Sequence, residues 1–273
     1  MRRLLVVGDD LGLAPGVNAG IAAAYRDGIL TSASLLANTP YFEDTLALAR
    51  DLPGLKIGIH LTLVAGKPLL SAAEIPSLLG RHGSFRPSWR QFLPAWLAGR
   101  VRVEEARAEW RAQIARVLKA GIRPAHLDSH QHLHLLPGLW RVALELGSEF
   151  GIPRIRVVRE PGPLPPGTPL SRRLVRGGLA ALSPSRPLAP PMHACEHCFG
   201  IARTGCVDLP TLLEILRRLP EGDSELITHP GLPDEKLLRD YPWGYRWAEE
   251  TRALTSEEAK REVVRLGIVL QRG

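Results

Sequence analysis

Residues 3–12 decide the fold, and they read Arg3-Leu4-Leu5-Val6-Val7-Gly8-Asp9-Asp10-Leu11-Gly12. The apolar run at their start is typical of a strand that is buried on both faces of a parallel sheet. The polar residues that follow predict a turn at the carboxyl end of that strand. Because active sites of α/β folds form at the carboxyl ends of parallel strands, Asp9 and Asp10 become candidate functional residues.

Helices and strands are predicted to alternate along the rest of the chain. Helical patterns cover residues 15–27, 41–52, 103–118, 139–150, 170–182, 208–219 and 255–266. Strand patterns cover residues 30–37, 55–63, 123–128, 153–159, 226–228 and 267–270. Asp208 is predicted to cap one helix, and Thr255 with Glu258 forms a predicted capping box for the last one. Between 65 and 99 the alternation lapses, and we expect an excursion over one face of the sheet.

This alternation predicts an α/β fold, an irregular (β/α) TIM-like barrel of about seven strands with long inserted loops. An open doubly wound sheet is the alternative. Neither an internal repeat nor a linker is visible, so we expect a single domain over residues 1–273. Residues 160–191 are rich in proline, arginine and glycine and are too long for a plain connector. They are interpreted either as a lid or substrate-contacting loop, or as a disordered insertion.

Composition describes an ordinary globular chain with a basic balance. Of its 273 residues 45% are hydrophobic and 23% charged, and the formal net charge is +7. The positive charges are scattered, and no basic stripe or known module points to nucleic acid, so that class of partner is excluded. Arginines favour anionic partners, so a peripheral contact with phosphate-bearing lipids at a membrane surface is compatible with the sequence. A homodimer is also compatible with it.

The apolar stretches are shorter than a membrane-spanning helix requires. The run that follows Arg2-Arg3 is also too short for a signal peptide. We therefore expect a cytoplasmic protein, with the inner face of the membrane as an alternative location.

Three cysteines, an odd number, argue against a disulfide framework. Cys195 and Cys198 form a Cys-x-x-Cys pair, flanked by His193 and His197. A structural zinc site would need both histidines, because no second ligand pair lies at a suitable spacing. A chance pairing of small residues is the interpretation we favour.

Four of the nine histidines lie in one short stretch, His126-Leu127-Asp128-Ser129-His130-Gln131-His132-Leu133-His134. If this stretch begins as a strand, the side chains of His126, Asp128 and His130 point to the same face. Three such side chains can hold a metal ion or move a proton. The alternative is a polar strand end whose histidines face water.

Further polar residues fall at predicted strand ends. His60 lies within the third strand, and His229 follows a late one. Each residue alone is a weak signal, because a histidine often merely ends a strand. Their joint placement with Asp9, Asp10 and the histidine stretch predicts an active site at this end of the sheet.

Five blocks of sequence also carry a family resemblance: GDDLGL (8–13), GILTSAS (28–34), GIHLTL (58–63), PAHLDSHQH (124–132) and THP (228–230). In these blocks the chain resembles the YdjC/ChbG-like carbohydrate deacetylases. The blocks occur in order over most of the chain and leave residues 65–100 and 160–195 uncovered. Within the family the chain looks most similar to the hopanoid-biosynthesis-associated branch. That similarity rests on its length and on a tail with Tyr245-Arg246-Trp247, Glu250 and Ala253-Leu254-Thr255.

The resemblance implies a barrel that carries one divalent metal ion and hydrolyses the acetamide of N-acetylated sugars. It places the metal ligands at Asp10, His60 and His130, with Asp9 beside them as the base. One carboxylate and two neutral imidazoles leave positions open for water and substrate, as a hydrolytic metal site requires. The ligand set favours Zn²⁺ by its softness, whereas the family suggests Mg²⁺, and the sequence leaves the choice open.

The remaining candidates have supporting roles. The leaving amine must be protonated, a task suited to a histidine near neutral pH, and His229 is the candidate acid. His126 and Asp128 are expected to support the metal ligands from behind. Another three residues are candidates for supporting or substrate contacts: Asn38, His132 and Arg156.

Three functions therefore compete. The first is a deacetylase that acts on an N-acetylglucosamine-type sugar, either soluble or part of a glycolipid such as a hopanoid-linked one. The second is a metal-dependent phosphoesterase on the same fold, in which Arg154, Arg156 and Arg159 would serve the phosphate. The third is a non-catalytic sugar- or metal-binding protein.

Overall fold

The structure, a computed structural model, describes residues 1–164, 168–184, 188 and 192–271. The described strands form one seven-stranded sheet with the order β4-β3-β2-β1-β6-β5, and β7 pairs with β1 off this path. Every pairing is parallel. The strands are β1 (Arg2–Leu11), β2 (Ser32–Leu35), β3 (Lys56–Leu61), β4 (Leu127–Ser129), β5 (His197–Phe199), β6 (Gly222–Thr228) and β7 (Val269–Leu270).

Backbone outside the regular strands joins the two ends of this path. Leu127 of β4 bridges to Ile155, and Arg154 bridges to His193, both in parallel. The N–H of Cys198 in β5 then donates to the carbonyl of Arg159. The sheet therefore curls round as an irregular TIM-like barrel, as predicted. The strand predicted at 153–159 is reduced to these bridges, in part because Pro153 has no N–H to donate.

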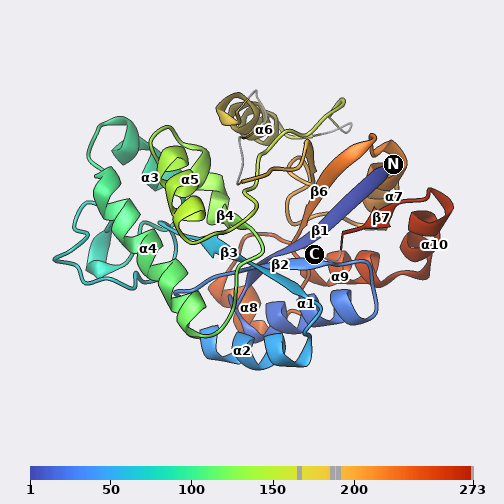
Figure 1. Ribbon diagram of the computed structural model, residues 1–273, viewed down its shortest axis with the longest axis horizontal. Helices are drawn as coiled ribbons and strands as arrows, with labels where there is room; N and C mark the ends of the chain where they lie inside the picture. The colour runs from blue at the N-terminus through green and yellow to red at the C-terminus, as the bar shows by residue number, and fades with distance from the viewer. Residues whose placement is uncertain (165–167, 185–187, 189–191, 272–273) are drawn as a thin grey trace.

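Helices surround the sheet (Figure 1). They are α1 (Pro15–Arg26), α2 (Phe42–Asp51), α3 (Trp89–Leu97), α4 (Val103–Lys119), α5 (Leu139–Glu149), α6 (Leu170–Leu182), α7 (Leu209–Arg218), α8 (Glu235–Asp240), α9 (Trp247–Thr255) and α10 (Glu257–Arg265), with 3-10 turns η1 (Arg81–Gly83) and η2 (His130–Leu135). In Figure 1, α1, α2 and α8 lie along one side of the sheet, and α3, α4 and α5 lie together at one end of the molecule.

Strand β1 runs through the centre of the core. All of its residues from Leu4 to Leu11 are buried, as the apolar run predicted. Burying one such aliphatic side chain stabilises the fold by about 1.5–3 kcal/mol. The strand continues beyond the predicted Val7, so Asp9 and Asp10 lie within its last residues and not in a separate turn. Core packing of β1 thus fixes the position of both carboxylates.

Several elements differ from the sequence-based expectation. Helices α3, α8 and α9 and strand β5 were not predicted, and their short, irregular patterns explain why. The predicted capping box is wrong by one residue: the Ser256 side chain accepts from the N–H of Ala259 and caps α10. Thr255 instead ends α9, where its hydroxyl donates to the carbonyl of Thr251. Asp208 caps α7 as predicted.

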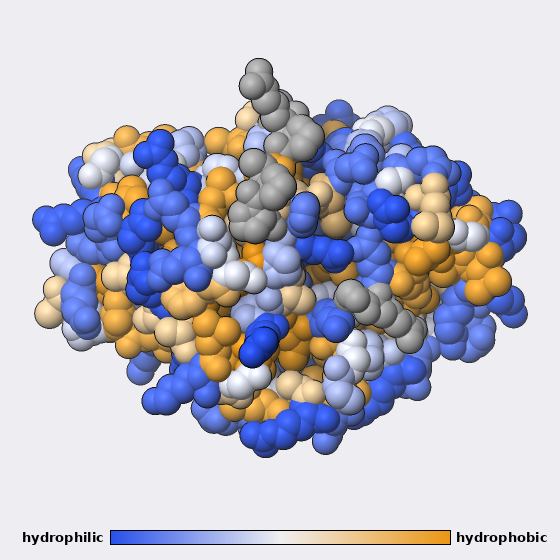
Figure 2. Space-filling view, viewed as in Figure 1, coloured by the Kyte–Doolittle hydropathy of each residue, from blue (hydrophilic) through white to orange (hydrophobic). Residues whose placement is uncertain are grey.

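The stretch predicted as a lid or a disordered insertion is described in part. Its helical patch forms α6 with the predicted bounds. Residues 165–167, 185–187 and 189–191 lie outside the described residues. None of the described helices is long and apolar enough to cross a membrane. Figure 2 shows that hydrophobic residues on one face of the molecule lie in separate areas between hydrophilic ones.

Candidate metal centre

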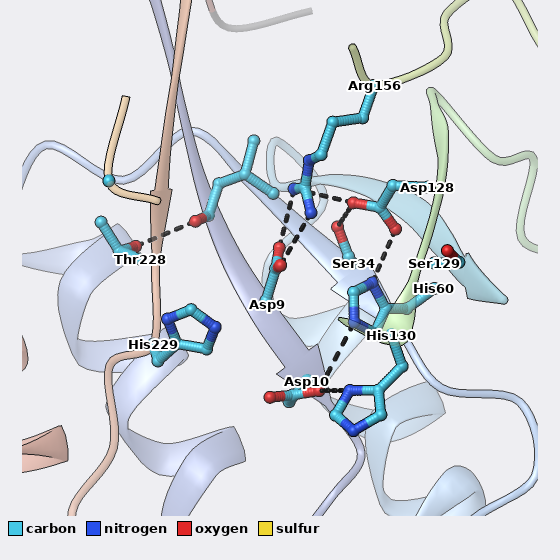
Figure 3. Close-up of polar contacts among 12 residues, drawn as sticks. Asp9, Asp10, Ser34, His60, Asp128, Ser129, His130, Arg156, Thr228 and His229 are labelled. Atoms are coloured by element: carbon cyan, nitrogen blue, oxygen red, sulfur yellow. Dashed lines mark hydrogen bonds and ion pairs between the residues drawn. The ribbon is translucent and has the colours of Figure 1, made fainter. Parts of the chain in front are cut away.

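The three predicted metal ligands converge at the carboxyl ends of the strands (Figure 3). Asp10 lies near the end of β1, His60 near the end of β3, and His130 begins η2 directly after β4. Oδ1 of Asp10 lies 2.9 Å from Nδ1 of His130 and 3.5 Å from Nε2 of His60. All three residues are buried. One ligand atom from each lies within 4.8 Å of the others, so the three residues can hold a single metal ion.

The Asp10 carboxylate is suited to a cation. Its Oδ1 is buried and, although both imidazoles lie close to it, has no hydrogen-bond partner of good geometry among the residues that the structure describes. A buried carboxylate oxygen without a donor is costly unless a cation or a proton compensates it. Burial alone would raise the pKa of Asp10, but the His130 and His60 imidazoles lower it below its usual range. The residue has a left-handed backbone with φ +66°, a region that aspartate tolerates better than most residues.

Asp128 orients His60 for the same task. Its Oδ1 lies 2.6 Å from Nδ1 of His60, on the side of the ring away from Asp10. A proton on Nδ1, shared with this carboxylate, leaves the Nε2 lone pair directed at Asp10. This is the usual arrangement behind a metal-bound histidine. Burial lowers the pKa of His60, but the carboxylates of Asp128, Asp9 and Asp10 outweigh burial and raise it to about 9, so a metal ion that binds at Nε2 displaces a proton from it.

Arg156 lies behind the ligands at the centre of three carboxylates. Its guanidinium donates to both oxygens of Asp9 at 2.7 and 2.8 Å. It also lies 2.7 Å from Oδ2 of Asp128 and donates from Nε to Glu225 at 2.6 Å. Arg156 is only 1% exposed, so its charge is compensated inside the protein. Asp9 is therefore held firmly, and Arg156 supports the site without facing solvent.

His229 and Glu250 form the opposite wall of the site. His229 follows β6, and its backbone N–H donates to Oε2 of Glu250 at 2.5 Å. The Nδ1 atom of His229 is buried and has no hydrogen-bond partner within the described residues. Burial is the main reason that the pKa of His229 is lowered, and burial also raises the pKa of Glu250 to about 8. His229 thus offers a neutral imidazole with an unused nitrogen.

His126 supports Asp128 indirectly. Its Nε2 lies 2.9 Å from the hydroxyl of Ser34, which in turn donates to Oδ2 of Asp128 at 2.7 Å. Burial lowers the pKa of His126 to about 4, so the ring is neutral. A Cβ on Gly58 would lie 2.2 Å from this ring, which explains why a glycine stands two residues before His60. The sequence did not predict the roles of Ser34 and Gly58.

Two further candidates lie outside the group of ligand atoms that surrounds Asp10. The Asn38 side chain donates from Nδ2 to the carbonyl of Lys67 at 2.8 Å. His132 is half-buried on the turn after His130 and has a left-handed backbone with φ +57°. Neither residue has a contact that assigns it a role.

An aromatic run that was not predicted to lie at the site borders the centre. The ring of Trp243 lies 5.5 Å from that of His130, and the ring of Tyr245 lies 4.8 Å from that of His229. Tyr241 contacts the ring of Trp243, and Trp247 contacts the rings of both Trp243 and Tyr245. The signal in the sequence was four aromatic residues at alternate positions from 241 to 247, in a chain with only 5% aromatic residues.

The cysteine pair gains no support as a zinc site. Cys195 and Cys198 are buried free thiols, and burial raises the pKa of both. Cys198 lies on β5. Among the described residues, the groups that can hold a metal ion contain no cysteine.

Comparison with known proteins gives a consistent result. The family described as YdjC-like protein matches residues 3–264 of the chain. A carbohydrate deacetylase of Brevibacillus brevis is 31% identical over 96% of this chain and 94% of its own length. One of Thermoanaerobacter pseudethanolicus is 30% identical over 97% and 90%. The crystal structure of an Enterococcus faecalis protein named for cellobiose-phosphate cleavage is also similar. It has a TM-score of 0.78 and 28% identity over 99% of this chain and 97% of that one.

Proposed function

We propose that this chain, which belongs to the YdjC-like protein family, is a metal-dependent carbohydrate deacetylase. It removes the acetyl group from an N-acetylated amino sugar of the N-acetylglucosamine type. The observation that carries this proposal is the convergence of Asp10 with His130 and His60, whose imidazoles lie 2.9 and 3.5 Å from the same buried oxygen of Asp10. The names of the deacetylase relatives support the same activity.

Asp10, His60 and His130 would hold the divalent ion. When bound, this ion polarises the amide carbonyl and acidifies water, because an amide is otherwise a poor electrophile. Asp9 takes the proton of the attacking water, since each of its oxygens keeps a lone pair beside its bond to Arg156. Arg156 holds that carboxylate in place throughout.

His229 delivers a proton to the leaving amine. Asp9 passes the proton that it takes from the water to the unpaired Nδ1 of His229, and the lowered pKa of His229 makes the protonated ring a strong donor. Hydrolysis of the C–N bond then yields acetate and the free amino sugar. Glu250 positions His229 through the backbone N–H.

The substrate is a sugar that can rest on aromatic rings. Trp243 and Tyr245 are half-buried next to His130 and His229, where their faces suit the apolar side of a pyranose. The tail that contains Tyr245-Arg246-Trp247 extends the proposal to a lipid-linked amino sugar, with hopanoids as one class. The donor set suits Zn²⁺ by its two imidazoles and Mg²⁺ by its carboxylate.

The phosphoesterase alternative is less well supported. It needs arginines that are free to bind phosphate, but Arg156 is buried and paired with three carboxylates. The non-catalytic alternative requires no turnover, so it is separated from the deacetylase by assay alone.

The test is a set of parallel assays on metal-stripped protein reloaded with Mg²⁺ or Zn²⁺. Substrates are chitobiose, an N-acetylglucosaminyl lipid and a phosphoester, and both acetate and phosphate are measured. We expect acetate release that falls at least about a hundredfold in His130→Ala. It should be unchanged in His82→Ala, an exposed histidine outside the site. Phosphate release without acetate would favour the phosphoesterase. A lack of turnover on all substrates by metal-loaded protein would favour the binding protein.

A further inference from the structure

Helix α6 presents an apolar stripe to solvent. Leu170 is 70% exposed and Leu174, one turn later, is 67% exposed. Residues four apart lie on the same side of a helix, and Gly178 and Leu182 continue this stripe without a charge. A surface helix usually turns such a stripe toward the core. In α6 no residue is buried.

Two of the three arginines of α6 face the protein, whereas Arg173 is exposed. Arg172 donates to the carbonyl of Ala202, and Arg176 forms an ion pair with Glu160. Leu179 is the residue of α6 that packs against the small apolar cluster formed by Leu135, Val158, Cys198, Ile201 and Ile227. The helix is thus anchored mainly by polar contacts, and its apolar side remains outside.

This helix lies at the end of the barrel that carries the metal centre. α6 packs against η2, whose first residue is the predicted ligand His130. Ser183, directly after α6, exchanges hydrogen bonds with the backbone of Val158. In Figure 1, α6 stands at the edge of the molecule, apart from α1, α2 and α8. A surface that bound α6 would therefore lie near the site.

The sequence around α6 carries positive charge only. Between Glu160 and Glu196 there are four arginines, Arg172, Arg173, Arg176 and Arg186, and neither an aspartate nor a glutamate. The whole chain has a net charge of +7. Exposed leucines beside a local excess of positive charge are the properties by which a helix binds an anionic membrane surface.

We propose that α6 docks on an anionic lipid bilayer, with Leu170 and Leu174 inserted at the headgroup boundary. The barrel end that holds the metal centre then faces the membrane surface. A second copy of the chain is a poorer occupant, since it would bring two arginine-rich segments together without enough carboxylates to compensate them. The inference concerns binding alone, so it does not depend on the deacetylase chemistry.

The test is co-sedimentation of the full chain with phosphatidylcholine vesicles and with vesicles that also contain phosphatidylglycerol. We expect binding to the anionic vesicles only, weakened by high salt. Leu170→Ser/Leu174→Ser should lower the partition coefficient at least about tenfold. The matched control is Leu97→Ser/Val264→Ser, whose side chains are 76% and 80% exposed on α3 and α10.

Two further readouts separate the outcomes. Circular dichroism confirms that each variant is folded, and acetate release from chitobiose tests the active site separately. If the wild-type protein releases acetate but does not bind anionic vesicles, the docking inference is wrong and the proposed deacetylase activity stands. Equal loss of binding in both double variants would overturn it too. A concentration-dependent dimer that only Leu170→Ser/Leu174→Ser abolishes would assign the stripe to a second copy instead.

Discussion

Replacing Asp128 with asparagine should weaken metal binding by about a hundredfold without unfolding the protein. Oδ2 of Asp128 accepts a hydrogen bond from the hydroxyl of Ser34 and lies 2.7 Å from the guanidinium of Arg156. Both neighbours are donors, so the introduced amide would place its oxygen there. Its NH₂ group would then face Nδ1 of His60, 2.6 Å away in the native pair.

This exchange reverses the tautomer of His60. Nδ1 must then accept a hydrogen bond, so the proton moves to Nε2, the atom directed at Asp10. A protonated Nε2 cannot bind a metal ion, and restoring the other tautomer costs the amide its hydrogen bond. Losing such a supporting carboxylate typically reduces metal affinity 10- to 100-fold, or about 1.4–2.7 kcal/mol, and the upper end applies here.

Folding should tolerate the change, because Arg156 keeps its bonds to Asp9 and Glu225. The assay is an equilibrium titration with Mn²⁺ followed by electron paramagnetic resonance, alongside urea denaturation. Asp223→Asn is the control, because Asp223 forms a partly exposed ion pair with Arg3 at the other end of β6. Metal affinity within about twofold of the wild type in Asp128→Asn, or an equal loss in Asp223→Asn, would refute the reasoning.

Three other outcomes are expected for substitutions in and around the site. Arg156→Met leaves three buried carboxylates without their partner, so urea denaturation should show that the free energy of unfolding falls by about 3–5 kcal/mol. A fall of less than about 1 kcal/mol would contradict a role of Arg156 in stability. Burial lowers the pKa of His134 to about 4, against about 6.5 in the unfolded chain, so the histidine takes up a proton more readily when the chain unfolds. The contribution of His134 to the free energy of unfolding is complete above about pH 6.5 and is lost as the pH falls through 4. The loss amounts to up to about 3 kcal/mol, and His134→Gln should make the unfolding free energy less dependent on pH in this range. An unchanged pH dependence of the unfolding free energy in this variant would contradict that assignment. Trp243→Ala should raise KM for chitobiose up to about tenfold with little change in kcat, because stacking on the sugar is lost. A fall in kcat alone would show that Trp243 acts through His130 instead.

The local patterns of the sequence predicted most of the barrel. A strand such as β1, buried on both faces, leaves a continuous apolar run, and an amphipathic helix leaves a periodic one. Helix α9 was missed because it lies next to α10, and a capping signal that belongs to Ser256 was assigned to Thr255. A shift of one residue is beyond the resolution of propensity alone.

The site was predictable only where a ligand falls at a strand end. Asp10, His60 and His130 have that position, and the structure brings them together. The full environment of Arg156 was not predictable, because it joins Asp9, 147 residues away, with Asp128 and Glu225 on other strands. Strand register decides which side chains meet across a barrel, and this register cannot be read from a single sequence.

Supporting residues were missed for the same reason. Glu225 precedes the predicted strand 226–228 and was not assigned to it, but β6 begins earlier and buries this residue. Ser34 and Glu250 lie in the quoted sequence blocks, but their contacts were not predicted because their partners lie on other elements.

Equilibrium binding of Mn²⁺ or Zn²⁺ to wild-type protein and to Asp10→Ala tests the central claim most directly. His82→Ala serves as the control for a substitution outside the site. In the proposed centre Asp10, His60 and His130 hold one ion together, so the wild type and His82→Ala should each bind about one ion per chain tightly. Asp10→Ala should bind none at the same concentration. Retention of one tightly bound ion by Asp10→Ala, with acetate release at the wild-type rate, would contradict the assignment of this centre.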